Sequence, residues 1–325
     1  MHLTPRILFT SLSAKLGLYE QVLVQAREFD PCSTVVGTDS DPNCYAAKFV
    51  EEFRLMPAID QLSDQRLIKY LESFGITHVL PTRDNELEYW SERSQLLKKF
   101  GVKVWVSQSN FINACLDKFR FYKEWKHSAI GPIKTMVSIG DENFGQWVVK
   151  EKYGSGASGI GLNLSLSEAQ KCATLLKDPI YQPFIKAKEF TAETWVSKQR
   201  RCHGVVLRWR NRVVDGESHE TTVFTHSKWE QAMQDVFLNS KGAQGHILAQ
   251  VLVDQNDKLY LVEINPRLGG ASSLSLSAGL SSITWNLIEE NDDGSLIPLS
   301  PLIRNGMKLI KENGVQFIST EKCLP

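Results

Sequence analysis

Carboxylate, amide and guanidinium groups alternate along one short segment in the last third of the chain. Two antiparallel strands joined by the polar turn 254–257 are expected there, and the second strand carries Glu263, Asn265 and Arg267. Side chains two residues apart on a strand share a face, so these groups can point into one cleft, which Gln250 joins from the partner strand. Carboxylate and amide oxygens suit Mg2+, and arginine suits phosphate. The pattern indicates a metal–nucleotide site, although by itself it also fits an ordinary hairpin.

A second group of residues upstream could hold phosphate. Lys150 ends the expected strand 146–151, and the glycine-rich loop 153–159 begins three residues later. Glycine lets backbone N–H groups approach a phosphate closely, Ser155 and Ser158 can add hydroxyl donors, and lysine supplies a point charge. The Gly-Lys-Ser/Thr ending of a Walker loop is missing. A flexible hairpin turn remains the alternative.

Two further features could complete a nucleotide site. Lys118 lies on an expected helix, where a lysine is ordinarily a solvated charge. The apolar segment 181–185 could pair a base edge with its main chain around Gln182 and Phe184, and Glu189 could accept hydrogen bonds from ribose hydroxyls. The alternative for this segment is an edge strand followed by a salt-bridged glutamate.

The first part of the chain alternates strands with helices, which predicts an open parallel sheet. The expected strands are 6–10, 33–37, 77–80 and 102–106, and the expected helices are 15–29, 63–74 and 86–100. No Gly-x-Gly-x-x-Gly follows the first strand, which argues against dinucleotide binding.

Beyond residue 113 the pattern of expected strands and helices changes. The expected strands are 146–151, 160–164, 180–185, 189–197 and 202–209, and the expected helices are 117–126, 167–176, 227–239, 270–280 and 282–290. Capping boxes are expected at Ser167 with Gln170 and at Ser227 with Glu230. The segment 291–325, with two weak strands, is expected to be a C-terminal appendage.

Composition excludes several classes of protein. The 325 residues carry 37 Lys+Arg and 37 Asp+Glu, so no net charge favours nucleic acid or an anionic membrane. No apolar run is long enough to cross a bilayer, and the start lacks the layout of a signal peptide. Six scattered cysteines without a Cys-x-x-Cys pair indicate free thiols and a cytoplasmic protein.

The order of these features resembles the ATP-grasp superfamily, in the branch similar to carbamoyl-phosphate synthase large-subunit domains and carboxylate–amine ligases. The elements that carry the resemblance are Asp117-Lys118, Val148–Lys150 with its loop, Gln182–Ile185 with Lys188–Thr191, and Glu263–Arg267. The resemblance implies an α/β fold with an N-terminal open parallel-sheet (pre-ATP-grasp) domain at 1–112. A two-lobed α+β ATP-grasp domain at 113–325 would follow, with its lid at about 130–185 and its C-terminal lobe at about 186–325.

The same resemblance implies roles for individual residues. The residues expected to bind ATP are Lys118, Lys150, Gly154, Ser155, Gly156, Ser158, Gln182, Phe184, Ile185 and Glu189. The residues expected to bind two Mg2+ ions, or Mn2+, are Gln250, Glu263 and Asn265. The residues expected to be catalytic are Arg267, Arg210 and Lys150, whereas Arg208 and Arg212 are expected to be surface charges. Two positions depart from the family: Glu151 replaces a usual proline, and Gln250 replaces a carboxylate.

By resemblance, the chain is an ATP-dependent carboxylate–amine ligase that forms an amide through an acyl phosphate and releases ADP and phosphate. The expected partners are an amine and a small polar carboxylate such as an amino acid. Neither nucleic acid nor a membrane is expected, and the sequence is compatible with a homodimer. The small-residue tract 269–279 is expected to form one wall of the substrate pocket. Two alternatives remain: a kinase-type phosphotransferase using a histidine such as His203, His219 or His226, and a non-catalytic ATP-binding subunit.

Overall fold

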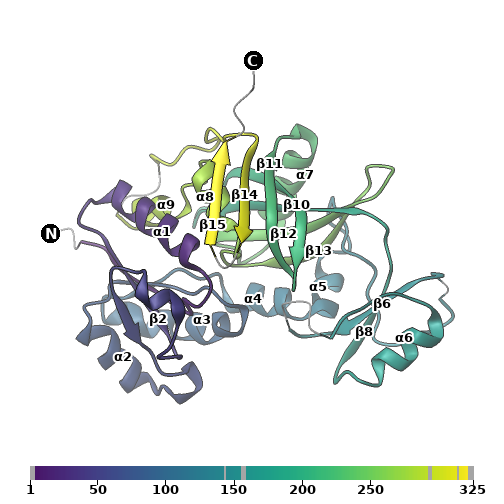
Figure 1. Cartoon of the computed structure of the whole chain (residues 1–325), viewed down its shortest axis with the longest axis horizontal. Helices are drawn as coiled ribbons and strands as arrows, with labels where there is room; N and C mark the ends of the chain where they lie inside the picture. Colours follow the sequence, from purple (N-terminus) through teal and green to yellow (C-terminus); the bar gives the residue numbers. More distant parts are fainter. Residues whose placement is uncertain (1–3, 143, 155–158, 292–294, 313–314, 321–325) are drawn as a thin grey trace.

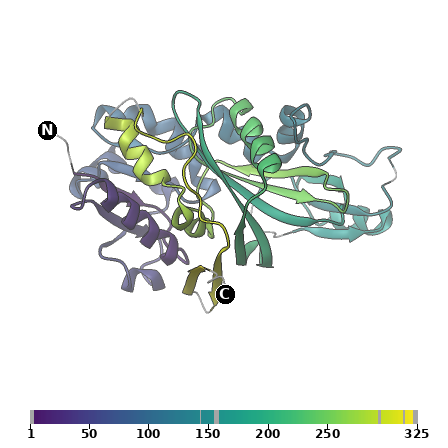
Figure 2. The ribbon, with the colours of Figure 1, turned by 90° about the horizontal axis from the view of Figure 1, so that it is seen from above.

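The computed structural model describes residues 4–142, 144–154, 159–291, 295–312 and 315–320. Figure 1 shows three parts: an N-terminal domain, a large central sheet, and a small lobe at the opposite end from the N-terminal domain. Figure 2 shows the same order from above, with the central sheet between the two flanking parts.

The N-terminal domain is an open sheet of five parallel strands in the order β3-β2-β1-β4-β5. The strands are β1 (Arg6–Phe9), β2 (Thr34–Asp39), β3 (Phe53–Leu55), β4 (His78–Leu80) and β5 (Lys103–Val104). The elements between them are α1 (Leu16–Phe29), η1 (Tyr45–Lys48), η2 (Ile59–Gln61), α2 (Asp64–Ser73) and α3 (Asp84–Lys99). The predicted parallel α/β fold is confirmed. Strand β3 was not predicted, because it is a three-residue edge strand without a buried residue.

The strand order reverses at the centre of this sheet. β1 lies between β2 and β4, and the chain leaves the carboxyl ends of β1 and β4 toward the starts of α1 and α3. In open α/β sheets such a reversal opens a crevice in which ligands bind. The loops at this crevice contain Lys15 and the segment Thr82–Asp84, and they face the rest of the molecule.

The central sheet has seven antiparallel strands in the order β13-β12-β9-β10-β11-β14-β15. The strands are β9 (Lys188–Val196), β10 (Cys202–Val214), β11 (Glu217–Phe224), β12 (Gly245–Val253), β13 (Leu259–Asn265), β14 (Met307–Glu312) and β15 (Val315–Thr320). The predicted antiparallel hairpin is formed by β12 and β13, with Gln250 opposite Glu263.

Alternating side chains give this sheet two buried faces. On one face Phe190 and Ile247 pack with α7 (Ser227–Asn239), and α4 (Ser109–Leu116) and α5 (Lys118–Trp125) join the same core. On the other face Trp195 and Val206 pack against α8 (Ser272–Ala278) and α9 (Ser282–Asn291). The polar residues of the site lie on this second face. The predicted domain boundary at residue 112 falls within α4 and stays a prediction.

The C-terminal segment is part of the central sheet, so its prediction as an appendage is wrong. β14 pairs with β11, and β15 pairs with β14. Met307 and Leu309 of β14 are buried in the core beneath the sheet. The outer strand β15 is largely exposed, so the segment lacks the continuous buried pattern of a core strand.

The small lobe is a three-stranded sheet in the order β7-β6-β8, covered by one helix. Its elements are β6 (Trp147–Glu151), β7 (Gly161–Leu164), α6 (Leu166–Ala173) and β8 (Pro179–Pro183). Trp147 and Val149 pack against Ala169 and Ala173 of α6. Since side chains alternate along β6, Val148 and Lys150 point to the other face, toward the central sheet.

Two predicted helix caps are each displaced. α6 is capped by Ser165 with Glu168, two residues before the predicted pair, because the helix begins at Leu166. α7 is capped by His226, whose ring nitrogen accepts from Trp229 N, while Glu230 accepts from His226 N. Across the described ranges, no helix combines the length and apolar character that spanning a bilayer requires.

Candidate active site

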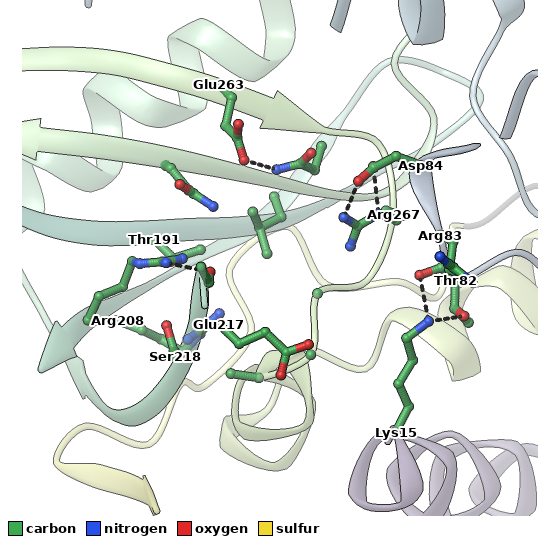
Figure 3. Close-up of a pocket in the computed structure, with 18 of the residues that line it drawn as sticks. Lys15, Thr82, Arg83, Asp84, Thr191, Arg208, Glu217, Ser218, Glu263 and Arg267 are labelled. Carbon is green, nitrogen blue, oxygen red and sulfur yellow. Dashed lines mark hydrogen bonds and ion pairs between the residues drawn. The ribbon is translucent and has the colours of Figure 1, made fainter. Parts of the chain in front are cut away.

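Two adjoining cavities lie along the polar face of the central sheet. The lid cavity, about 360 Å3, lies between the small lobe and the sheet. The junction cavity, about 340 Å3, lies where the sheet meets the N-terminal domain (Figure 3). Arg210, Gly216, Gln250 and Glu263 line both cavities, so the two form one continuous site.

The sheet register sets these polar residues side by side. Gln250 of β12 pairs with Glu263 of β13 on one side and with Thr191 of β9 on the other, and Thr191 pairs with Arg208 of β10. Directly opposed residues share a face of the sheet. Four side chains from separate strands therefore form a single polar row beneath the cavities.

The predicted metal ligands come together at the common wall. Asn265 Nδ2 donates to Glu263 Oε1 over 2.8 Å, which fixes both side chains and leaves the Asn265 carbonyl oxygen free to coordinate. With Gln250, they offer carboxylate and amide oxygens, a donor set that fits Mg2+. Among the described residues, no cluster of three or more His, Cys, Asp or Glu side chains has ligand geometry. With one protein carboxylate, a bound ion would need phosphate oxygens to complete its shell.

Two predicted phosphate ligands lie across the lid cavity from these oxygens. Lys150 is 7% exposed, and burial lowers the pKa of its ammonium to about 8. Within the described part of the chain, Lys150 Nζ has no hydrogen-bond or ion-pair partner. Lys118 Nζ donates to Gly154 O over 2.8 Å, and burial lowers its pKa also. The cavity therefore has one buried and one half-buried cation, and no carboxylate of the described residues contacts either.

The predicted base-binding segment is only partly at this cavity. Gln182 lines it, but its side chain donates to Thr135 Oγ1 over 2.7 Å and its backbone belongs to the β6–β8 pairing. The Phe184 N–H already donates to Gln146 O over 2.9 Å, which corrects the expectation that this main chain is free. Among the described residues that line the cavity, Phe184 and Ile185 are absent. Its apolar walls are formed instead by Ile133, Val148, Ile160, Leu162, Val213, Leu252 and Val262.

Glu189 and Arg210 form a pair at the floor of the lid cavity. Their closest atoms, Glu189 Oε1 and Arg210 Nε, are 3.2 Å apart, and Arg210 also donates to Gly216 O over 2.8 Å. Burial raises the pKa of Glu189, although Arg210 opposes that effect. Arg210 thus lies at the wall between the two cavities, and its catalytic role stays a prediction. The ribose role of Glu189 stays a prediction.

Arg267 is held by a residue of the N-terminal domain. Its guanidinium contacts both oxygens of the Asp84 carboxylate, with Nε to Oδ1 at 2.6 Å (Figure 3). Such a two-pronged contact fixes the plane of the guanidinium. Asp84, in the first turn of α3, was not among the predicted site residues. Only the fold brings it to Arg267, across 183 residues of sequence.

Arg208 is not a surface charge, so that prediction is wrong. It is 2% exposed and pairs with the fully buried Glu193, while Thr221 and Ser275 accept further hydrogen bonds. Burial alone would raise the pKa of Glu193, but Arg208 and His246 lower it to about 2. Strand parity could have revealed this, because residues 208 and 210 share a face. Arg212, past a bulge in β10, is exposed as expected.

The glycine-rich loop is described only at its ends. Gly154 has a positive φ of 115°, and its carbonyl accepts from Lys118. Ser155, Gly156 and Ser158 lie outside the described residues. Glu151, where the family usually has proline, accepts from the N–H groups of Lys177 and Asp178 at 2.8 and 3.0 Å and so closes the end of the small sheet.

The chain matches a known protein family in sequence. Residues 115–271 match the family described as ATP-grasp domain. No curated protein is detectably similar to the chain in sequence.

Several solved structures are similar to the chain over nearly its whole length. A biotin carboxylase from Campylobacter jejuni has a TM-score of 0.73 and 14% identity, over 94% of this chain and 75% of that one. N5-carboxyaminoimidazole synthetase from Staphylococcus aureus has a TM-score of 0.71 and 16% identity, over 95% and 83%. The biotin carboxylase domain of 2-oxoglutarate carboxylase from Hydrogenobacter thermophilus has a TM-score of 0.71 and 13% identity, over 95% and 74%. At such identities the likeness establishes the two-lobed fold and its preceding α/β domain.

Proposed function

We propose that this chain, which belongs to the ATP-grasp superfamily, is an ATP-dependent ligase that activates a small carboxylate and joins it to an amine. ATP would occupy the lid cavity and the carboxylate the junction cavity. The similar synthetase from Staphylococcus aureus has been crystallised with ADP, and the Hydrogenobacter carboxylase domain with MgADP and bicarbonate, which supports nucleotide use by this fold.

The observation that carries the proposal is a charge imbalance inside the lid cavity. Buried Lys150 and half-buried Lys118 have no carboxylate contact among the described residues, and they line the same cavity as Gln250 and Glu263. A buried charge is unfavourable unless it is compensated. A triphosphate compensates the lysines, and a divalent cation between it and Glu263 compensates the carboxylate.

The residues at the common wall would serve the transfer step. When bound, Mg2+ would neutralise charge on the phosphates and hold them in position. Glu263, fixed by Asn265, would orient the terminal phosphate group, and Lys150 would neutralise it. Arg267 and Arg210, both on the junction side, would stabilise the charge that develops as the substrate carboxylate attacks the γ-phosphorus. The attack forms an acyl phosphate and ADP, and the amine then expels phosphate from the acyl carbon.

The apolar walls of the lid cavity suit the base. Ile133, Val148 and Leu252 come from three separate segments and line the cavity together. Flat apolar walls exclude water from a bound ring system, and few polar groups are needed to orient it. Gln182 is the polar residue that we propose for this purpose.

A kinase-type transfer through a phosphohistidine has less support. His203 is buried against Trp195 with its Nδ1 against Pro298 O, and His226 caps α7. Neither these two nor His219 is among the described residues that line the two cavities. A purely structural ATP-binding role is disfavoured by the second cavity, which a nucleotide does not need.

The experiment is a phosphate-release screen with MgATP over paired carboxylates and amines. The ligase proposal predicts that phosphate and ADP accumulate only when both compounds of a productive pair are present. ATP consumption that depends on no carboxylate, or release of a phosphorylated product without an amine, would contradict it.

A further inference from the structure

The charges that line the junction cavity differ in how they are neutralised. Most are paired: Arg267 with Asp84, Arg208 with Glu193, Arg210 with Glu189, and Glu217 with Lys311 over 2.7 Å. Glu263 lies at the other end, at the proposed metal site. The cations that remain are Lys15 and Arg83, both from the N-terminal domain.

Lys15 is held by neutral oxygens. Its Nζ donates to Thr82 Oγ1 at 2.7 Å, Thr82 O at 3.1 Å and Ser11 O at 3.2 Å, as Figure 3 shows for the Thr82 contacts. These bonds aim the ammonium but leave its charge uncompensated. Within the described residues, neither Lys15 nor the Arg83 guanidinium has an ion-pair partner.

Glu86, an acid whose charge acts on Lys15, is occupied by other donors. Its Oε1 accepts from Thr10 Oγ1 at 2.7 Å and from the N–H groups of Thr82 and Arg83 at 2.9 Å each, and its Oε2 accepts from Trp90 Nε1 at 3.3 Å. A carboxylate bonded in this way shapes the loop before α3. It stabilises the position of Lys15 at a distance without contacting it.

The fold places these two cations where a ligand is expected. Lys15 follows β1 and Arg83 follows β4, so both stand at the carboxyl ends of the two strands where the parallel sheet reverses its order. They also precede the first turns of α1 and α3, whose N–H groups favour an anion. The reversal, the cavity and the unpaired charges coincide at one place.

A second polar group in the same cavity lacks a partner. Thr191 Oγ1 is buried, its residue is 1% exposed, and no described group bonds to it. Thr191 stands in the polar row between Gln250 and Arg208. A substrate that extends from the common wall toward Lys15 passes this hydroxyl.

We infer that the junction cavity takes a dicarboxylate, with one carboxylate at Arg210 and Arg267 for activation and the second at Lys15 and Arg83. The inference rests on the proposed function and deepens it. The cavity, about 340 Å3, is at the small end of ligand sites, which suits a short chain between the two groups. The second carboxylate does not react: it positions the first one.

The test compares matched substrates that differ only in the second charge. Phosphate release is measured with aspartate against asparagine, glutamate against glutamine, and succinate against succinamate, each with MgATP and an amine. We expect the dicarboxylate of a productive pair to have a kcat/KM at least about tenfold higher than its half-amide, chiefly through KM. In Lys15→Met that ratio should fall toward one, whereas Lys69→Met, an exposed lysine on α2, should preserve it.

Two outcomes overturn the inference. One is a half-amide that reacts as well as its dicarboxylate, and the other is a folded Lys15→Met variant that keeps the full ratio, whether or not both compounds react more slowly. If no pair supports turnover, calorimetric titration of the same acids into the MgADP-saturated protein decides. Absence of dicarboxylate binding there refutes the inference, while absence of MgADP binding itself refutes the proposed function instead.

Discussion

The lysines of the lid cavity and the arginines of the junction cavity use charge in opposite ways, whereas Lys15 and Arg83, at the N-terminal-domain end of the junction cavity, resemble the lid lysines in having no ion-pair partner among the described residues. In the lid cavity, Lys150 and Lys118 lack carboxylate contacts, so their charge is available to a ligand. In the junction cavity, Arg267, Arg208 and Arg210 are each held by an acid, so their geometry is fixed before anything binds. Uncompensated charge favours tight binding, whereas paired charge favours orientation. The lid cavity is thus built to bind, and the wall it shares with the junction cavity is built to align.

The two cavities also differ in where their residues come from. The polar residues of the lid cavity belong to short motifs, each visible within a few positions of sequence. The junction cavity combines loops of the N-terminal domain, the β10–β11 hairpin and the start of α8, with Lys311 of β14 holding Glu217. Both cavities depend on how distant parts of the chain pack, but only the junction cavity includes the N-terminal domain.

The largest expected effect belongs to the wall that both cavities share. Glu263→Gln removes the only carboxylate among the predicted metal ligands, and turnover should fall roughly a thousandfold. Unfolding free energy should change by less than about 1 kcal/mol, because Glu263 lies on a cavity wall. Steady-state turnover and ADP titrations with and without Mg2+ measure this. Glu72→Gln, at an exposed position of α2, is the control. Normal turnover in Glu263→Gln would refute the metal assignment.

A change confined to the lid cavity should weaken binding. Lys150→Met removes a buried cation, and MgADP affinity should fall about a hundredfold, the scale of losing charged hydrogen bonds. Thermal stability of the ligand-free protein should be unchanged or higher, because a desolvated charge is replaced by an apolar group. Calorimetry and thermal unfolding test both parts, with Lys171→Met on α6 as the matched control. A variant that binds MgADP normally would mean that Lys150 does not contact phosphate.

A change behind the shared wall should affect the alignment of Arg267 without affecting nucleotide binding. Asp84→Asn loosens Arg267, so kcat should drop roughly ten- to a hundredfold while MgADP affinity stays the same. Arg267→Ala combined with Asp84→Asn should be no worse than Arg267→Ala alone, since both changes remove one interaction. The readout is a double-mutant cycle in kcat. Additive losses would show that Asp84 acts independently of Arg267.

The smallest effect is a pH dependence that should separate binding from stability. The pKa of Lys150 is lowered to about 8, so its phosphate-binding charge is present below that pH and lost above it. MgADP affinity should therefore weaken above pH 8, by at most about tenfold per pH unit for this group. Stability of the ligand-free protein should change in the opposite direction between pH 8 and 10.5, because the unfolded chain binds more protons there. Lys150→Met should flatten the affinity profile, and an unaltered profile would exclude Lys150 as its origin.

Sequence reasoning predicted most elements of the fold because their periodicities are strong. The parallel N-terminal sheet, the β12–β13 hairpin and its opposed Gln250 and Glu263 are confirmed. The ATP-grasp resemblance is also confirmed, since its motifs are local. Errors occurred where contacts with distant segments decide the structure. They concern the place of strand β14 in the central sheet, the burial of Arg208 and the hydrogen bond of the Phe184 N–H.

The sequence alone determined which residues could share a strand face, because alternation is a local property of an extended chain. It therefore predicted that Gln250, Glu263 and Asn265 could hold a metal ion and that Lys150 could hold phosphate. Only the tertiary structure decided which charges are neutralised. Asp84 pairs with Arg267, Glu193 pairs with Arg208, and Lys15 has no ion-pair partner among the described residues. Contacts between distant segments depend on packing, which periodicity does not encode.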